Sequence, residues 1–224
     1  MSYCVAIDGP AGAGKSTIAK QVAKKMNLVY VDTGAMYRAM ALFMIRAGIK
    51  ETDTDKIDCR CEDADITIKY ESGEQVVYLN GENVNAYLRT EEVGNMASVS
   101  SARPKVRKKL VSLQKQLART TDVIMDGRDI GTCVLPDADV KIFLTASSAI
   151  RAKRRFDELT AKGESCNLKE IEKDIIERDK RDMTRKESPL KKAEDAILVD
   201  SSDMTIEEVI SAITDICEKQ KGSN

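Results

Sequence analysis

The stretch from Gly9 to Ser16 has the residue types and the spacing needed to bind a phosphate chain. It matches the pattern G-x-x-x-x-G-K-[ST] at every position. Glycines let the backbone curl so that successive N–H groups converge on phosphate oxygens. Lys15 can reach the β- and γ-phosphates, and Ser16 can ligate Mg²⁺. We therefore expect these residues to bind a nucleoside triphosphate: Gly9, Pro10, Ala11, Gly12, Ala13, Gly14, Lys15, Ser16 and Thr17.

The surroundings of this phosphate loop (residues 9–16) also fit. Tyr3–Ile7 is a short apolar run typical of a buried strand, and Ile18, Val22 and Met26 follow with helical spacing. A helix that begins at the loop points its positive end at a bound anion. The loop alone leaves kinases, GTPases, motors and transporters open. An N-K-x-D guanine motif does not occur in the sequence, which argues against a GTPase.

Two further motifs follow predicted strands. Val31–Arg38 follows the second strand, and Asp126–Gly131 follows the third. Ligands of an open parallel sheet gather outside the carboxyl ends of its strands. We therefore expect Thr33 and Arg38 to face the same crevice as the phosphate loop. Asp126 stands at a strand end, where its carboxylate can hold Mg²⁺ through water.

Composition restricts the chemistry. The chain of 224 residues contains no histidine, which excludes Ser-His-Asp catalysis and imidazole-ligated metals within it. Its net charge of −1 argues against broad binding to nucleic acid or membranes. We see neither a signal peptide nor an apolar run long enough to span a membrane, so we expect a cytoplasmic protein.

The positions of the elements predict an α/β fold. Apolar runs predict five strands at residues 3–7, 28–31, 123–125, 140–144 and 197–199. Helical patterns predict helices between them at residues 15–26, 35–47, 91–119 with a break near Pro104, 148–162 and 168–183, and a last helix after Thr205. This alternation predicts a parallel five-stranded sheet covered on both faces. Alternating residues between 64 and 85, with turns at Ser72-Gly73 and Asn80-Gly81, predict a small inserted antiparallel sheet. We expect disorder only in the tail, residues 219–224.

Together these motifs resemble those of the bacterial cytidylate kinases. The similar segments are IDGPAGAGKST, VDTGAMYR, LRTEEV, DGRDIGT, PDADVKIFLTAS and RDKRDMTR, in this order and spacing. The match runs from about Val5 to about Ile210, and DGRDIG together with the inserted sheet is its most specific part. The resemblance implies the P-loop kinase fold, transfer of a phosphoryl group from ATP with Mg²⁺ to CMP or dCMP, and a monomer.

The resemblance also implies roles for particular residues. The catalytic residues are Lys15, Arg128, Arg178 and Arg185. The residues expected to bind CMP are Thr33, Arg38, Ser98, Arg107, Arg128, Asp129, Asp182 and Arg185. We also expect Arg154 to bind ATP, and Ser16 and Asp126 to bind the metal. A carboxylate such as Asp129 would accept from the cytosine amine and repel the carbonyl of uracil, which predicts a preference for CMP.

Other interpretations of these residues stay open. Arg38 is also compatible with a solvated helix position, and Arg128 and Asp129 with stabilising a turn. Ser98 and Arg107 lie on helices without a local motif. Solvated helix faces would equally explain Arg151, Arg154 and Arg155, and the stretch 178–192.

We predict three domains. Residues 1–34, 93–150 and 187–224 would form the ATP-binding core, residues 35–92 the monophosphate-binding domain, and residues 151–186 a helical lid. Closure of the last two would exclude water from the phosphates. Two alternative functions remain: a P-loop phosphotransferase acting on UMP, dTMP or a non-nucleotide such as shikimate, and an ATP-dependent switch that forms no diphosphate.

Overall fold

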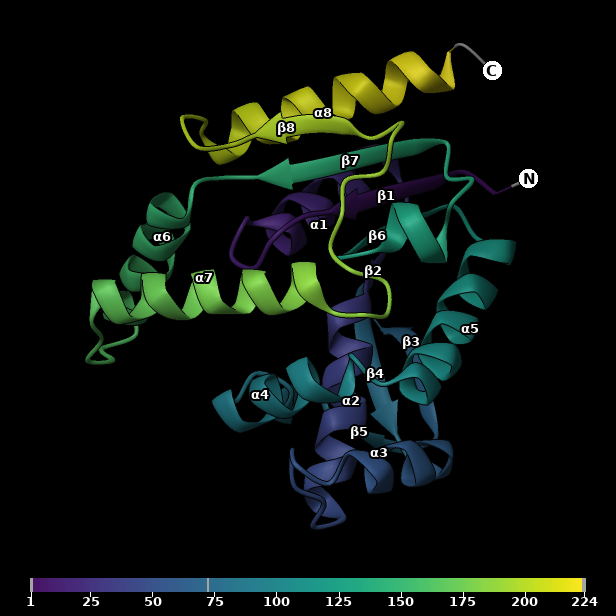
Figure 1. Ribbon diagram of the computed structural model, residues 1–224. Coiled ribbons are helices and arrows are strands. Elements are labelled where there is room, and N and C mark those ends of the chain that lie inside the picture. Colours follow the sequence, from purple (N-terminus) through teal and green to yellow (C-terminus); the bar gives the residue numbers. More distant parts are fainter. Residues whose placement is uncertain (1, 72, 223–224) are drawn as a thin grey trace. The chain divides into compact units, whose positions relative to one another are not determined.

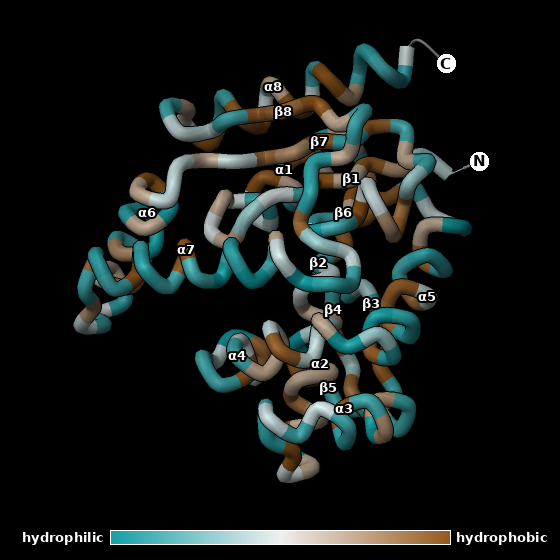
Figure 2. The backbone as a smooth tube through the Cα atoms, viewed as in Figure 1, coloured by the Kyte–Doolittle hydropathy of each residue, from teal (hydrophilic) through white to brown (hydrophobic). Residues whose placement is uncertain are grey.

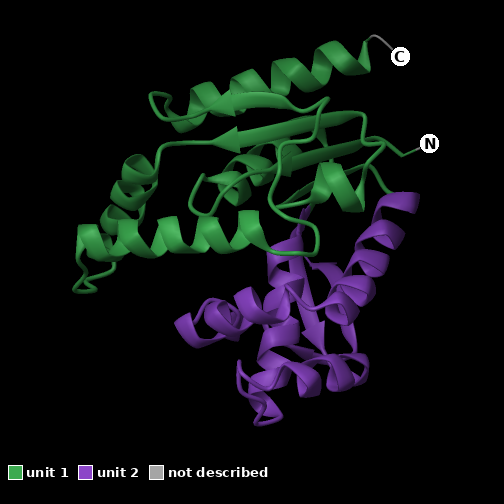
Figure 3. Cartoon of the chain, viewed as in Figure 1, with its two compact units in different colours: residues 1–30, 121–224 green, residues 31–120 purple. Residues whose placement is uncertain are grey.

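The computed structural model describes residues 2–71 and 73–222, and it contains two compact units (Figure 3). The first unit combines residues 1–30 with 121–224, and the second is residues 31–120. Each is described by itself below. No helix in the described part of the chain is long and apolar enough to cross a membrane.

A five-stranded sheet with the order β2-β6-β1-β7-β8 organises the first unit (Figure 1). Its strands are β1 (Cys4–Asp8), β2 (Val29–Asp32), β6 (Val123–Gly127), β7 (Val140–Thr145) and β8 (Ile197–Asp200), and the boundary between the units falls within β2. Strand β1 pairs in parallel with both β6 and β7, and β7 pairs in parallel with β8. The predicted parallel five-stranded sheet is confirmed. Because β1 is central, its carboxyl end lies between the ends of two neighbouring strands.

The α-helices in the described part of the first unit are α1 (Lys15–Met26), α6 (Ser148–Ala161), α7 (Leu168–Thr184) and α8 (Ile206–Lys221), and a short π-helix spans Ile130–Val134. Helices α1 and α8 bury their apolar faces on the sheet, where Val22 and Ile213 join Ile7 and Ile142 in the core. Figure 2 shows hydrophobic residues along the central strands and mostly hydrophilic residues along α7. Thr205 forms the predicted capping box with Glu208 at the start of α8.

The second unit contains the inserted antiparallel sheet, with the order β3-β4-β5. Its strands are β3 (Ile66–Glu71), β4 (Glu74–Leu79) and β5 (Glu82–Asn83). Asn80 and Gly81 have φ values of 50° and 83° between β4 and β5, the left-handed conformation that a tight hairpin turn needs. Ser72 of the other predicted turn lies outside the described residues. The helices here are α2 (Thr33–Arg46), α3 (Thr54–Arg60), α4 (Glu91–Ser100) and α5 (Pro104–Thr120).

The two units differ from the predicted domain division. Helices α4 and α5 belong to the second unit, whereas the sequence predicts residues 93–120 in the ATP-binding core. Residues 151–186 group with the first unit, and their role as a lid stays a prediction. The predicted disordered tail is also partly wrong, because Lys219–Lys221 end helix α8. Residues 223 and 224 lie outside the described residues.

Candidate active site

The phosphate loop joins β1 to α1, in the predicted strand–turn–helix arrangement. A Cβ atom at Gly9 would lie 1.9 Å from the carbonyl oxygen of Leu144, so only glycine fits where the loop passes β7. Gly14 caps α1 with a φ of 81°, a left-handed conformation that glycine adopts without strain. The glycines thus allow the tight turn that carries the chain from β1 to the start of α1, where a helix favours a bound anion.

Lys15 is buried beside this loop, with 6% of its surface exposed. Its Nζ donates hydrogen bonds to the carbonyl oxygens of Gly9 and Pro10, at 2.8 and 2.7 Å. Burial lowers the pKa of Lys15 well below its ordinary value, and the charge of Arg128 lowers it further, while nearby carboxylates oppose both effects. Arg128 therefore acts electrostatically on the same lysine that the motif assigns to the phosphates.

Ser16 and Asp126, the two predicted metal ligands, are in contact. Ser16 Oγ donates to Asp126 Oδ2 at 2.8 Å. Tyr30 Oη donates to the other carboxylate oxygen at 2.8 Å. The described residues contain no cluster of three or more His, Cys, Asp or Glu side chains that could hold a metal alone. A hydroxyl beside one carboxylate nevertheless suits Mg²⁺, which keeps several waters and shares its shell with phosphates.

Asp8 connects the phosphate loop to the motif that follows β6. Its carboxylate, 4% exposed, accepts the backbone N–H groups of Ile130 and Gly131, both at 2.8 Å. Burial raises the pKa of Asp8 to about 6, although the two N–H groups oppose the shift. The sequence analysis missed this residue. Its position indicates a site residue, because Asp8 stands between the last apolar residue of β1 and Gly9 of the phosphate loop.

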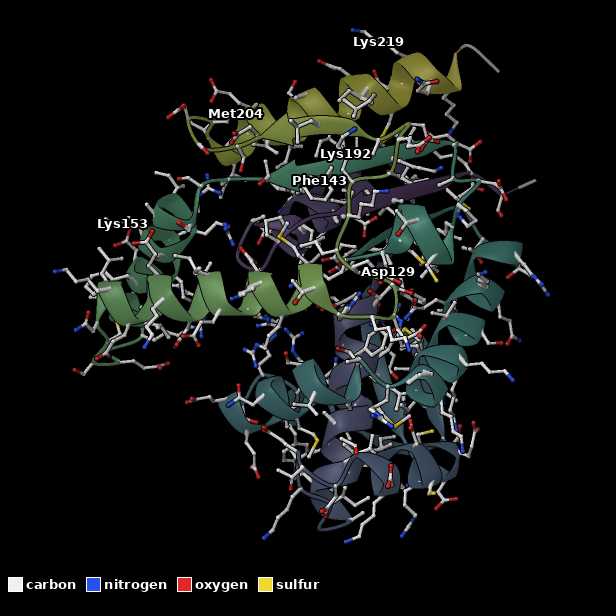
Figure 4. The ribbon with its side chains drawn as sticks, viewed as in Figure 1. Asp129, Phe143, Lys153, Lys192, Met204 and Lys219 are labelled. Atoms are coloured by element: carbon white, nitrogen blue, oxygen red, sulfur yellow. The ribbon has the colours of Figure 1, made fainter. Side chains whose placement is uncertain are left out.

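Two ion pairs join the motif after β6 to helix α7 and to its C-cap residue, Arg185. Arg128 Nε lies 2.9 Å from Asp182 Oδ2. Arg185 Nη2 lies 3.4 Å from Asp129 Oδ1, and both side chains are buried. Asp129 accordingly lies near the carboxyl end of α7 (Figure 4). The structure thus brings together four of the predicted CMP-binding residues, whose motifs are about fifty residues apart in the sequence.

The arginines of α6 and α7 have different surroundings. Arg178 is half-buried on α7, one turn before Asp182. Arg154 donates from Nη2 to the carbonyl oxygen of Ser201 at 2.6 Å and from Nη1 to its hydroxyl at 3.2 Å. Arg151 is buried and does not belong to a solvated face. That alternative interpretation is therefore wrong for Arg151.

The remaining predicted CMP-binding residues belong to the second unit: Thr33, Arg38, Ser98 and Arg107. Arg107 is buried, its Nη1 donates to the Ser101 carbonyl oxygen at 3.3 Å, and its guanidinium lies 5.7 Å from the ring centroid of Tyr37. Ser101 Oγ in turn donates to the carbonyl oxygen of Ser98 at 3.1 Å.

Ser98 and Arg107 therefore lie on successive helices and are connected through one residue. Thr33 is buried in the first turn of α2, and Arg38 is half-buried one turn later. The convergence of these residues on the phosphate loop stays a prediction.

In this parallel sheet, strand β1 runs through the phosphate loop into helix α1. That arrangement defines a P-loop nucleotide-binding protein. The sequence model of one family, described as cytidylate kinase, matches residues 5–219. The chain belongs to the cytidylate kinase family, so the resemblance drawn from its motifs is confirmed.

Individual relatives agree with that assignment. A cytidylate kinase of Caldicellulosiruptor saccharolyticus is 49% identical over 219 residues, which cover 98% of this chain and 97% of that protein. One from Lactobacillus johnsonii is 51% identical over 217 residues, covering 97% and 94%. Among solved structures, an uncharacterized protein from Eubacterium ventriosum has a TM-score of 0.55 at 12% identity, covering 98% of this chain and 99% of that one. That likeness concerns the fold.

Proposed function

We propose that the protein transfers the γ-phosphoryl group of ATP to CMP and dCMP, forming ADP with CDP or dCDP. The observation that carries the proposal is the meeting of Arg128 and Asp129 with Asp182 and Arg185 in the unit that contains the phosphate loop. This arrangement would supply guanidinium groups for the acceptor phosphate in the unit that holds the proposed ATP site. Membership of the cytidylate kinase family supports the choice of acceptor.

In this mechanism an oxygen of the CMP phosphate attacks the γ-phosphorus of ATP, and the bond from that phosphorus to the β-bridging oxygen breaks. The attacking oxygen is ionised near neutral pH, so no general base is required, in keeping with a chain that has no histidine. The main obstacles are the repulsion of two polyanions and the charge that develops on the transferred group. Positioning and electrostatic stabilisation therefore provide most of the catalysis.

The phosphate loop is the segment proposed to bind ATP. Its backbone N–H groups and Lys15 would hold the β- and γ-phosphates, and Arg154 would contribute from α6. Ser16 and Asp126 are the residues that would hold Mg²⁺. When bound with ATP, the ion would neutralise charge on the phosphate oxygens.

Separate groups of residues are proposed to bind the phosphate, the sugar and the base of CMP. The residues proposed for its phosphate are Arg38, Arg128 and Arg185. Asp182, supported by Arg178, would bind the sugar hydroxyls. The residues proposed for the cytosine are Thr33, Ser98, Arg107 and Asp129. We further propose, from the family resemblance and the balanced charge, that the enzyme acts as a monomer in the cytoplasm.

The direct test is ADP formation with CMP, dCMP, UMP, AMP and GMP compared side by side at saturating ATP. We expect kcat/KM to be highest for CMP and dCMP. Comparable values for all five would contradict cytosine recognition, and a preference for UMP, dTMP or shikimate in a wider panel would favour another acceptor. ATP binding without formation of any diphosphate would instead favour the switch function.

A further inference from the structure

Helices α6 and α7 both contact the backbone of one residue of the phosphate loop, Ala11. Arg151 Nη1 on α6 donates to the carbonyl oxygen of Ala11 at 2.8 Å. Asp179 Oδ1 on α7 accepts the N–H of Ala11 at 3.3 Å. The two side chains also pair with each other, because Arg151 Nη1 lies 2.7 Å from Asp179 Oδ2. The polar groups of residue 11 are thus bound by one arginine and one aspartate.

This pair is well enclosed. Arg151 is 6% exposed, and its Nε donates to the carbonyl oxygen of Ala146 at 2.9 Å, which orients the guanidinium from the base of α6. A Cβ atom at Gly12 would stand 3.5 Å from Arg151 Cβ, so the loop lies directly against α6. Charge-assisted contacts with fixed partners in a buried setting hold their geometry more firmly than exposed ion pairs do.

Asp179 lies close on α7 to residues that are proposed to bind CMP. Arg178 and Asp182 are four residues apart on α7 and so lie on one face of the helix, and Arg185 is the C-cap residue after its last turn. Asp182 and Arg185 contact the motif after β6. Asp179 and Asp182 are three residues apart, so their side chains lie about 60° apart around the helix. Neighbouring positions near the carboxyl end of α7 are therefore bound to the phosphate loop and to the motif after β6.

We propose that Arg151 and Asp179 are positioning residues. By binding both backbone polar groups of Ala11 they fix the distance between the phosphate loop and the carboxyl end of α7, which carries Arg178 and Asp182 and is followed by Arg185. The inference rests on the proposed function, because it assigns the loop to ATP and that face of α7 to the acceptor. Neither residue touches the reacting atoms in this scheme, so each acts through the placement of others.

The kinetic test uses Asp179→Asn, which keeps an oxygen for the Ala11 N–H but removes the charge that pairs with Arg151. We expect kcat to fall roughly ten- to a hundredfold, the scale of loss that a misplaced site produces, and KM for CMP to rise. The equilibrium Kd and the stoichiometry for ATP should change less than about twofold. This split separates positioning from general damage, because a merely structural role would leave KM for CMP unchanged in the folded fraction.

Arg151 supplies the second part of the test. Arg151→Gln should reproduce the pattern of Asp179→Asn, and Arg151→Lys should recover part of the loss because it restores the charge. The double variant Arg151→Gln with Asp179→Asn should lose no more than the worse single variant if the two residues act as a unit. Losses that multiply would contradict the pair. Asp174→Asn, an exposed carboxylate on the same helix, is the matched control and should behave as wild type.

Hydrogen exchange tests the same contact without relying on turnover. Asp179→Asn should increase exchange both in residues 9–14 and in α7, whereas Asp174→Asn should change neither. Unchanged exchange in both segments would overturn the positioning role even if the wild type proved inactive on every monophosphate. A second outcome would separate the two proposals. If the wild type forms CDP and Asp179→Asn keeps the wild-type kcat and KM for CMP, the positioning role is wrong and the proposed function stands.

Discussion

Arg128 Nε lies 2.9 Å from Asp182 Oδ2, so a proposed phosphate-binding arginine is ion-paired with the carboxylate proposed to bind the sugar. Both side chains are largely buried, and removing one partner of such a pair leaves the other with a desolvated charge. The two roles are therefore linked. An effect of either residue on CMP binding must include the altered orientation of its partner.

Asp182→Asn tests this link. The variant loses the charge that orients Arg128 and the acceptor for a sugar hydroxyl, so we expect KM for CMP to rise roughly tenfold, about 1.4 kcal/mol. KM for ATP should change much less, because the phosphate loop is untouched. Asp174→Asn on the same helix controls for loss of a carboxylate from α7. An unchanged KM for CMP would show that the pair is structural only.

Lys15→Ala should remove activity without weakening the fold. The ammonium is proposed to stabilise charge on the transferred phosphoryl group, so its loss should lower kcat by about a hundredfold or more. Because burial lowers the pKa of Lys15, the folded state disfavours its charged form. The melting temperature of the variant should accordingly equal or exceed that of the wild type. Turnover near the wild-type value would contradict the role assigned to Lys15.

Asp129 has two possible roles, and its contact with Arg185 makes the distinction measurable. If its carboxylate accepts from the cytosine amine, Asp129→Ala should lower the ratio of kcat/KM for CMP over UMP roughly tenfold, since an unsatisfied buried group costs about 1–3 kcal/mol.

Arg185→Gln breaks the same ion pair from the other side and keeps the carboxylate. It should weaken binding of both monophosphates and preserve their ratio. A lower melting temperature for Asp129→Ala with an unchanged ratio would support a purely structural role.

Most of the fold was predictable because its signals are local. Apolar runs placed all five strands of the large sheet within about two residues, four of them ending at an Asp, and Pro104 marked the break between α4 and α5. Helix α3 was not predicted. It spans Thr54–Arg60, and only Ile57 of its seven residues is buried, so the segment lacks the repeated apolar spacing that indicates a helix.

The site was predictable in its residue types but not in its contacts. The phosphate loop follows from one continuous motif, whereas Arg151 contacts a carbonyl group 140 residues away. A highly charged helix sequence such as that of α6 normally indicates a solvated face, and nothing near Arg151 shows that it is buried. Asp8 and Tyr30 were missed for the same reason, because their partners Gly131 and Asp126 lie on other strands or turns.

Asp8 should make stability depend on pH. Its pKa rises from 3.8 to about 6 on folding, so the folded state binds more protons than the unfolded state between these values. The contribution to stability is therefore complete below pH 4 and is lost as the pH rises toward 6. The full shift corresponds to roughly 3 kcal/mol.

Urea unfolding at pH 4, 5, 6 and 7 measures this contribution as the free energy of unfolding. Asp8→Asn cannot titrate, so its stability should decline less between pH 4 and 6 than that of the wild type. Asp137→Asn removes an exposed carboxylate and controls for the change in net charge. Parallel profiles for wild type and Asp8→Asn would show that Asp8 does not titrate in this range.

The lid proposed for residues 151–186 should be detectable by hydrogen exchange with a bisubstrate analogue in which CMP is joined to ATP through its phosphates. Exposed ATP would lose its phosphate to water, so closure over the phosphates is expected to accompany binding of both substrates. The analogue should slow exchange in α6 and α7 more than CMP or ATP alone.

Helix α8 is a control within the same chain, because it packs on the sheet through Ile213 and carries no proposed ligand, so it should show no added protection. Lys15→Ala should reduce the effect, because it weakens the phosphate contacts that closure would complete. Equal exchange of α6 and α7 with and without the analogue, at concentrations that saturate binding, would contradict the lid.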